Sequence, residues 1–195
     1  YKVVFKEEHM VEPIKVGKTF DLQEYYTHPE RYRSTFEQYV SSLSILMNCI
    51  FWSTQYPRLI TKTYMKQLFQ TKKTLRLKVI GDISADVNGA VEFTEKTTSP
   101  DNPVFVYNPS TDTIKDGYEA EGVVVMAVDN LPCELPKESS ESFSEVLLRY
   151  VPQIMTADFT APDFEAVRLP AEIKNAVILY QGKLTPSYQY INKYL

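Results

Sequence analysis

An uninterrupted apolar run at residues 123–128 constrains the fold of this chain more than any other stretch. Consecutive β-branched and apolar residues without alternation predict a strand that is covered on both faces. The run stops at Asp129 and Asn130, which favour a turn, and at Pro132, which cannot donate to a β-ladder. Apolar residues at helical spacing follow from residue 137 to about residue 150. A strand, a short polar loop and a helix form the α/β unit whose carboxyl-end loop binds ligands.

The same order of elements occurs earlier in the chain. Residues 43–52 and 75–80 are apolar runs that predict two further strands, the first of them buried. Between them, Thr61 is placed to cap a helix whose apolar residues recur at 64, 65, 68 and 69. We therefore expect an α/β fold in which each strand ends in a polar loop.

Residues 87–122 separate the third and fourth predicted strands. Within this insertion, short strands are expected at residues 91–93 and 104–107, and residues 108–112 carry a clear turn signal. We expect the insertion to lie over the carboxyl ends of the sheet strands.

Composition excludes several classes of protein. A chain of 195 residues suits one or two domains, and its formal net charge of −4, without a basic run, argues against a nucleic-acid surface. No apolar stretch reaches the roughly 18 residues of a membrane span. The six glycines form neither a GxGxxG motif nor a P-loop. Cys49 and Cys133 are far apart and predict neither a disulfide framework nor a metal cluster.

Candidate chemistry lies at the ends of two predicted strands. Asp82 and Asp86 follow the third strand, and Asp129 and Asn130 follow the fourth. If these strands are parallel and adjacent, the two loops meet at one edge of the sheet, where paired carboxylates can act as general acid or base or hold a substrate ammonium. The alternative is that these residues only turn the chain and cap the next helix. No His joins the carboxylates, so no metal site is predicted.

Several motifs at these loops carry a resemblance to a known family. They are GDISADVNG at residues 81–89, VEFT at 91–94, VDNLP at 128–132 and LPKE at 135–138, with HPERY at 28–32 and PRLIT at 57–61. In this order they resemble the later part of the lysine–ketoglutarate reductase region of bifunctional α-aminoadipic semialdehyde synthase. More distantly they are similar to fungal saccharopine dehydrogenase and alanine dehydrogenase.

The resemblance implies the later half of a Rossmann-like doubly wound parallel sheet, with a short β insertion and a C-terminal return segment. Residues 1–40 would be connecting helical turns, 41–155 the partial dinucleotide-binding domain with its insertion at 87–122, and 156–195 the return toward a substrate domain. The family enzyme is an NADP-dependent oxidoreductase that condenses lysine with 2-oxoglutarate and reduces the imine to saccharopine.

The resemblance also implies roles for individual residues. Asp86 would be catalytic, Asp82 and Asp86 would bind substrate, and Asp129, Asn130 and Leu131 would contact the nicotinamide of NADPH. The family's glycine-rich phosphate loop and its catalytic Lys and His have no counterpart here. The chain also begins at Tyr1 without an initiator Met. We therefore expect a fragment that is inactive alone, binds NADPH weakly or not at all, and works with the remainder of its parent chain.

Three further expectations follow from the resemblance. The parent would be a homo-oligomer. It would act in the mitochondrial matrix, or in the cytoplasm if the source is plant-like. The partners would be lysine and 2-oxoglutarate or saccharopine, without nucleic acid or membrane. The alternative from another class of protein is a non-catalytic α/β binding or oligomerisation module.

Overall fold

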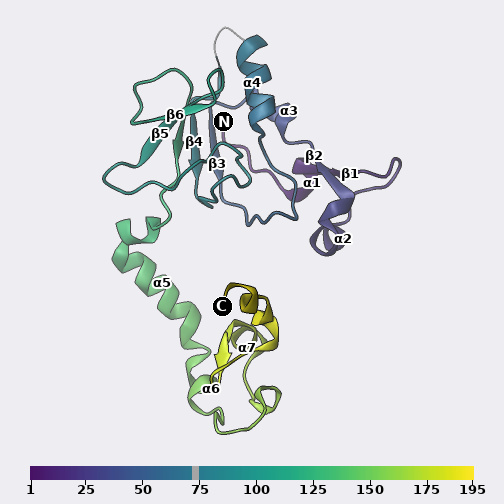
Figure 1. Ribbon diagram of the computed structural model, residues 1–195, viewed down its shortest axis with the longest axis vertical. Helices are drawn as coiled ribbons and strands as arrows, with labels where there is room; N and C mark the ends of the chain where they lie inside the picture. The colour runs from purple at the N-terminus through teal and green to yellow at the C-terminus, as the bar shows by residue number, and fades with distance from the viewer. Residues whose placement is uncertain (72–74) are drawn as a thin grey trace. The chain divides into compact units, whose positions relative to one another are not determined.

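A computed structural model describes residues 1–71 and 75–195 (Figure 1). The chain forms two compact units, Tyr1–Glu134 and Leu135–Leu195. The first unit contains the sheet and all the candidate site residues predicted from the sequence, which are Asp82, Asp86, Asp129, Asn130 and Leu131. No helix within the described ranges is long and apolar enough to cross a membrane.

A five-stranded mixed sheet forms the centre of the first unit. Its strands are β3 (Ile45–Asn48), β4 (Val79–Asp82), β5 (Val104–Asn108), β6 (Thr113–Asp116) and β7 (Val123–Met126). They are arranged in the order β3-β4-β7-β5-β6. β3, β4 and β7 run parallel, whereas β5 is antiparallel to both β7 and β6. The α/β class with a Rossmann-like sheet is therefore confirmed, and the parallel part comprises the three strands that the sequence predicts.

Short elements precede and flank this sheet (Figure 1). β1 (Val11–Pro13) and β2 (Tyr32–Ser34) form a separate antiparallel pair. The helical elements of this unit are α1 (Glu7–Met10), α2 (Leu22–Thr27), η1 (Pro29–Arg31), α3 (Glu37–Val40), α4 (Lys62–Thr71) and η2 (Leu131–Glu134). The predicted cap of α4 is confirmed, because the Thr61 hydroxyl accepts a hydrogen bond from the Tyr64 amide at 3.1 Å.

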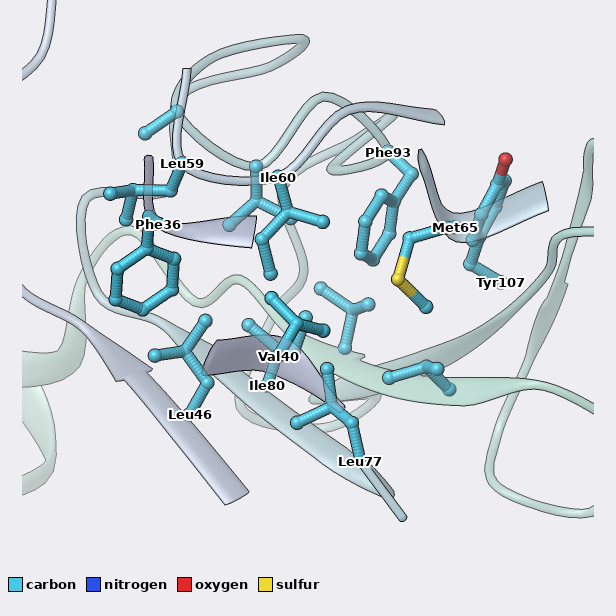
Figure 2. Close-up of a cluster of buried hydrophobic side chains, with 14 of the residues drawn as sticks. Phe36, Val40, Leu46, Leu59, Ile60, Met65, Leu77, Ile80, Phe93 and Tyr107 are labelled. Carbon is cyan, nitrogen blue, oxygen red and sulfur yellow. The ribbon is translucent and has the colours of Figure 1, made fainter. Parts of the chain in front are cut away.

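The core lies against one face of the sheet. Leu46 and Ile80 project from β3 and β4 toward Val40, Ile60 and Met65, all of them buried (Figure 2). Phe93 stacks on Tyr107 with ring centroids 4.6 Å apart, which extends the core toward β5. Burial alternates along β3 between buried and exposed residues, however, so the prediction of a buried strand is wrong there, whereas β7 is fully buried on one face and partly buried on the other. Met47, on the other face, is 55% exposed.

The insertion lies at the carboxyl ends of the strands only in part: the Thr94 hydroxyl donates to Asp82 at the end of β4, and the Thr98 amide donates to the Ala127 carbonyl directly after β7. Its strands β5 and β6 join the sheet itself, because β7 has a second edge that the Val, Phe and Tyr residues of β5 can pair with. The strand predicted at residues 91–93 is also absent. Val91 forms only an isolated bridge to Ile60 and then a turn to Thr94, while Val91 and Phe93 are fully buried. Val91 and Phe93 are thus apolar because they belong to a loop that packs into the core, not because they form a β-strand.

The second unit begins with α5 (Pro136–Leu148) and continues through α6 (Val151–Met155), η3 (Phe164–Ala166), α7 (Ala171–Ala176), β8 (Leu179–Tyr180), β9 (Lys183–Leu184) and η4 (Pro186–Tyr194). The helix predicted from residue 137 is confirmed as α5, with Pro136 in its first turn. Its predicted apolar face is not a buried one, since Phe143 is 66% exposed.

Gly122 offers a test of the β5–β7 junction. A Cβ at Gly122 would lie 2.0 Å from the Tyr107 carbonyl oxygen, and its φ of +143° disfavours any L side chain. We expect Gly122→Ala to lower the free energy of unfolding by roughly 3 kcal/mol or more. Gly117→Ala is the matched control, because Gly117 also has positive φ (+85°) but no atom within 4 Å of the added Cβ. It should cost only about 1 kcal/mol. Equal losses in denaturant titrations of the two variants would contradict the steric explanation.

Candidate active site at the carboxyl ends of β3 and β4

A buried hydrogen-bonded cluster joins the ends of β3 and β4. The parallel register pairs Asn48 with Asp82, so both side chains lie on the core face of the sheet. The Asn48 Nδ2 donates to Asp82 Oδ1 at 2.8 Å, and the Thr94 hydroxyl donates to Asp82 Oδ2 at 2.6 Å. None of the three residues is more than 1% exposed. Two polar donors thus satisfy both oxygens of a carboxylate that water does not reach.

This arrangement makes Asp82 an internal anchor. A buried carboxylate without hydrogen bonds would be strongly unfavourable, so Asn48 and Thr94 are what allow an aspartate at this position. The Asn48 carbonyl also accepts the Ile83 amide at 2.8 Å, which continues the β3–β4 contact beyond the strands. Asp82 therefore faces the interior of the unit, and it is the following turn that reaches the surface.

The turn after β4 has an unusual backbone. Ala85 and Asn88 both have a φ of +52°, in the left-handed region that non-glycine residues rarely adopt. The Ser84 hydroxyl donates to the Ile50 carbonyl at 2.5 Å, and the Gly89 amide donates to the Asp86 carbonyl at 2.9 Å. These bonds hold Asp86 between two strained residues.

Asp86 is half-buried at the mouth of this cluster. Burial raises the pKa of the Asp86 carboxyl, and the charge of the nearby Asp82 raises it further. A partly buried carboxyl group at a strand end can take part in proton transfer or bind a cation. Of the carboxylates predicted from the sequence, the structure thus brings Asp82 and Asp86 together and leaves Asp86 accessible.

The loop after β7 starts at the same edge of the sheet, since Gly81 of β4 pairs with Met126 of β7. The expectation that the two strands are parallel and adjacent is confirmed. Asp129 and Asn130 are exposed, and Leu131 opens η2. Among the hydrogen bonds of residues 1–71 and 75–195, none links Asp129 or Asn130 to Asp82 or Asp86. The two loops therefore share an edge without direct contact.

Sequence reasoning missed the polar partners of Asp82 and the contacts of Arg58. Asn48 lies within an apolar run, which is a detectable signal, but nothing in the sequence indicates that it and Thr94 both hydrogen-bond Asp82. Arg58 donates to the carbonyls of Asn88 and Gly89, and no pattern of neighbouring residues predicts these long-range hydrogen bonds.

A surface pocket of about 470 Å³ lies away from this cluster, beside the β1–β2 pair. Its lining includes Lys18, Glu24 and Arg31. Hydrogen bonds from Lys18, Arg31 and Tyr32 lower the pKa of Glu24 to about 2. Lys18, Glu24 and Arg31 are thus engaged with one another, which makes the strand-end cluster the better candidate site. The described residues contain no group of three or more His, Cys, Asp or Glu suited to a metal ion.

Parallel strands with polar turns at their carboxyl ends are the arrangement of Rossmann-like α/β proteins, which bind ligands at this edge of the sheet. The model of the alanine dehydrogenase/PNT C-terminal domain matches residues 21–187, and the chain belongs to this dehydrogenase family.

Individual relatives agree. An α-aminoadipic semialdehyde synthase of Arabidopsis thaliana is 38% identical over 192 residues, covering 98% of this chain and 17% of the relative. The mitochondrial α-aminoadipic semialdehyde synthase of Bos taurus is 32% identical over 204 residues, covering 98% of this chain and 22% of the relative. An NAD(+), L-lysine-forming saccharopine dehydrogenase of Emericella nidulans is 34% identical over 121 residues, covering 58% of this chain and 28% of the relative. The resemblance found in the sequence is confirmed, and the chain spans about a fifth of the length of the two synthases.

Removing the Asp82 carboxylate should destabilise the first unit. Asp82→Ala leaves the buried Asn48 amide and Thr94 hydroxyl without their acceptor, at an expected cost of about 2–4 kcal/mol in the free energy of unfolding. Asp86→Ala is the control, since the Asp86 side chain makes no hydrogen bond within the described residues, and it should change stability by less than about 1 kcal/mol. Similar losses for both variants in urea titrations would show that the cluster does not stabilise the fold.

The raised pKa of Asp86 predicts a stability change of a defined sign. Because the folded-state pKa lies above the unfolded one, the charged form of Asp86 costs stability as pH rises through that window. Asp86→Asn should therefore melt at a higher temperature than the parent at pH 7, and the difference should shrink toward pH 4. Calorimetry over this pH range measures it; a variant that melts lower at pH 7 would contradict the assignment.

Proposed function

We propose that this chain supplies the nicotinamide-side wall of the active cleft in a lysine–ketoglutarate reductase. The reaction condenses the amine of lysine with 2-oxoglutarate and reduces the imine to saccharopine with hydride from NADPH. The observation that carries the proposal is the match to α-aminoadipic semialdehyde synthases over 98% of the chain. The fungal relatives named for saccharopine add support, because saccharopine is the product of the proposed reaction.

In this proposal Asp86 is the residue that meets the substrate. A carboxylate at the mouth of the strand-end cluster can orient the lysine ammonium before imine formation and take up a proton afterwards. Partial burial strengthens such an ion pair compared with water. Asp82 contributes to substrate binding indirectly, as the buried anchor of the turn that carries Asp86.

The loop after β7 would contact the cofactor. Asp129 and Asn130 are exposed polar residues at the carboxyl edge of the sheet, where α/β proteins bind dinucleotides, and Leu131 offers an apolar contact for the nicotinamide ring. The phosphates of NADPH need a glycine-rich turn at a helix N-terminus. We propose that another part of a longer parent provides that turn together with the catalytic Lys and His.

The remaining features of the parent are proposals of the same kind. Residues 41–155 would belong to its dinucleotide-binding domain, residues 1–40 would connect to it, and residues 156–195 would return toward a substrate domain. The parent would be a homo-oligomer. The mammalian relatives carry mitochondrial in their names, which favours the mitochondrial matrix as its compartment.

A kinetic comparison in the full-length parent tests the role of Asp86. Asp86→Asn keeps the shape and removes the charge, so kcat/KM for lysine should fall by roughly 10²-fold, the equivalent of a charge-assisted contact of about 2–3 kcal/mol. KM for NADPH should be nearly unchanged. Asp101→Asn, at an exposed turn, is the matched control and should behave as the parent does.

Two outcomes would decide against this reading. If Asp86→Asn and Asp101→Asn both retain parental kcat/KM, Asp86 is only a turn residue. If the parent itself does not oxidise NADPH in the presence of lysine and 2-oxoglutarate, the reductase proposal fails as a whole.

A further inference from the structure

The turn that carries Asp86 needs an external restraint. Ala85 and Asn88 flank Asp86 in left-handed conformations, each of which costs about 1–2 kcal/mol for a residue with a Cβ. Such strain persists only where surrounding contacts over-determine the backbone. The hydrogen bonds of Ser84 and of the Asn48–Asp82–Thr94 cluster restrain the side of the turn that follows β4. The other side requires a separate restraint.

Arg58 provides contacts on that second side. Its Nε donates to the Gly89 carbonyl at 3.2 Å, and its Nη2 donates to the Asn88 carbonyl at 3.0 Å. Two consecutive carbonyls are therefore held by one planar guanidinium, whose donors have a fixed relative geometry. The Asn88 amide in turn donates to the Thr94 carbonyl at 2.8 Å. Thr94 also hydrogen-bonds Asp82 through its hydroxyl, so this bond connects the turn to the buried cluster.

Arg58 itself contacts Glu92 and Trp52. Its Nη1 lies 3.6 Å from Glu92 Oε1, and its guanidinium carbon lies 5.7 Å from the centre of the Trp52 ring. The second oxygen of Glu92 accepts the Lys62 amide at 2.8 Å, at the first residue of α4. The Leu59 amide donates to the Ala90 carbonyl at 2.8 Å. The guanidinium thus connects the Asp86 turn to the N-terminus of a helix.

We infer that Arg58 is a positioning residue, which fixes the Asp86 turn in its functional conformation by clamping the carbonyls of Asn88 and Gly89. It touches no reacting atom, and it acts through the backbone that presents Asp86. The inference rests on the proposed function for its catalytic consequence, but not for the clamp itself. Lysine cannot replace arginine here, because a single ammonium on a flexible stem does not reproduce the two-donor fork.

Hydrogen–deuterium exchange on the full-length protein tests the clamp without reference to activity. In Arg58→Lys, the amides of Asn88 and Gly89 should exchange roughly tenfold faster, the equivalent of about one hydrogen bond. Arg33→Lys is the matched control: Arg33 also pairs with a carboxylate, Glu12, but in the β1–β2 pair. It should leave exchange at residues 82–94 unchanged. Parental exchange there in Arg58→Lys would overturn the inference.

Kinetics on the same variants test the functional consequence. Arg58→Lys should lower kcat/KM for lysine roughly tenfold and leave KM for NADPH unchanged. Arg33→Lys should leave both kcat/KM for lysine and KM for NADPH at the parental values. A faster-exchanging turn with parental kcat/KM, or a lowered melting temperature alone, would show that Arg58 is merely structural and overturn the positioning role. If the parent shows no reductase activity, the proposed function fails separately, and the exchange data still decide whether Arg58 holds the turn.

Discussion

The carboxylate of Asp82, buried between Asn48 and Thr94, is the constraint on which the rest of this site depends. Removing an anion from water is tolerated here only because each carboxylate oxygen has a donor at hydrogen-bonding distance. Those donors come from β3 and from the loop after residue 93, so satisfying one charge fixes three segments together. The same charge lies beside Asp86 and contributes to its raised pKa. The fixing of these three segments and the raised pKa of Asp86 thus both involve the charge of Asp82.

Asp82 and Asp86 show how two carboxylates can differ in environment although they are four residues apart. Asp82 ends a strand and is enclosed by donors, whereas Asp86 lies in a strained turn and retains access to solvent. An environment that disfavours the charge of Asp86 also strengthens its attraction for a cationic substrate. The dehydrogenase family of the chain agrees with such a site at the carboxyl ends of parallel strands.

Local signals made part of this structure predictable. The apolar run of β7, the Thr61 cap of α4 and the turn between β5 and β6 follow from a few neighbouring residues each, and all three are present. Asp86 could be selected from the sequence because it lies in a contiguous motif, residues 81–89, that carries the family resemblance. The pairing of β5 with β7 and the contacts of Thr94 and Arg58 join segments that are distant in sequence. The apolar or polar character of these segments alone does not predict which distant segment each of them will contact.

The position of β7 has a consequence for the order in which the chain can fold. β7 lies between β4 and β5, and both of these strands are synthesised before it. Until residues 123–126 leave the ribosome, β3–β4 and β5–β6 are two separate ribbons, each with an open inner edge that another chain could pair with. The parallel contact to β4 and the antiparallel contact to β5 then form around one late strand. Vectorial synthesis would thus expose two aggregation-prone edges that the finished sheet conceals.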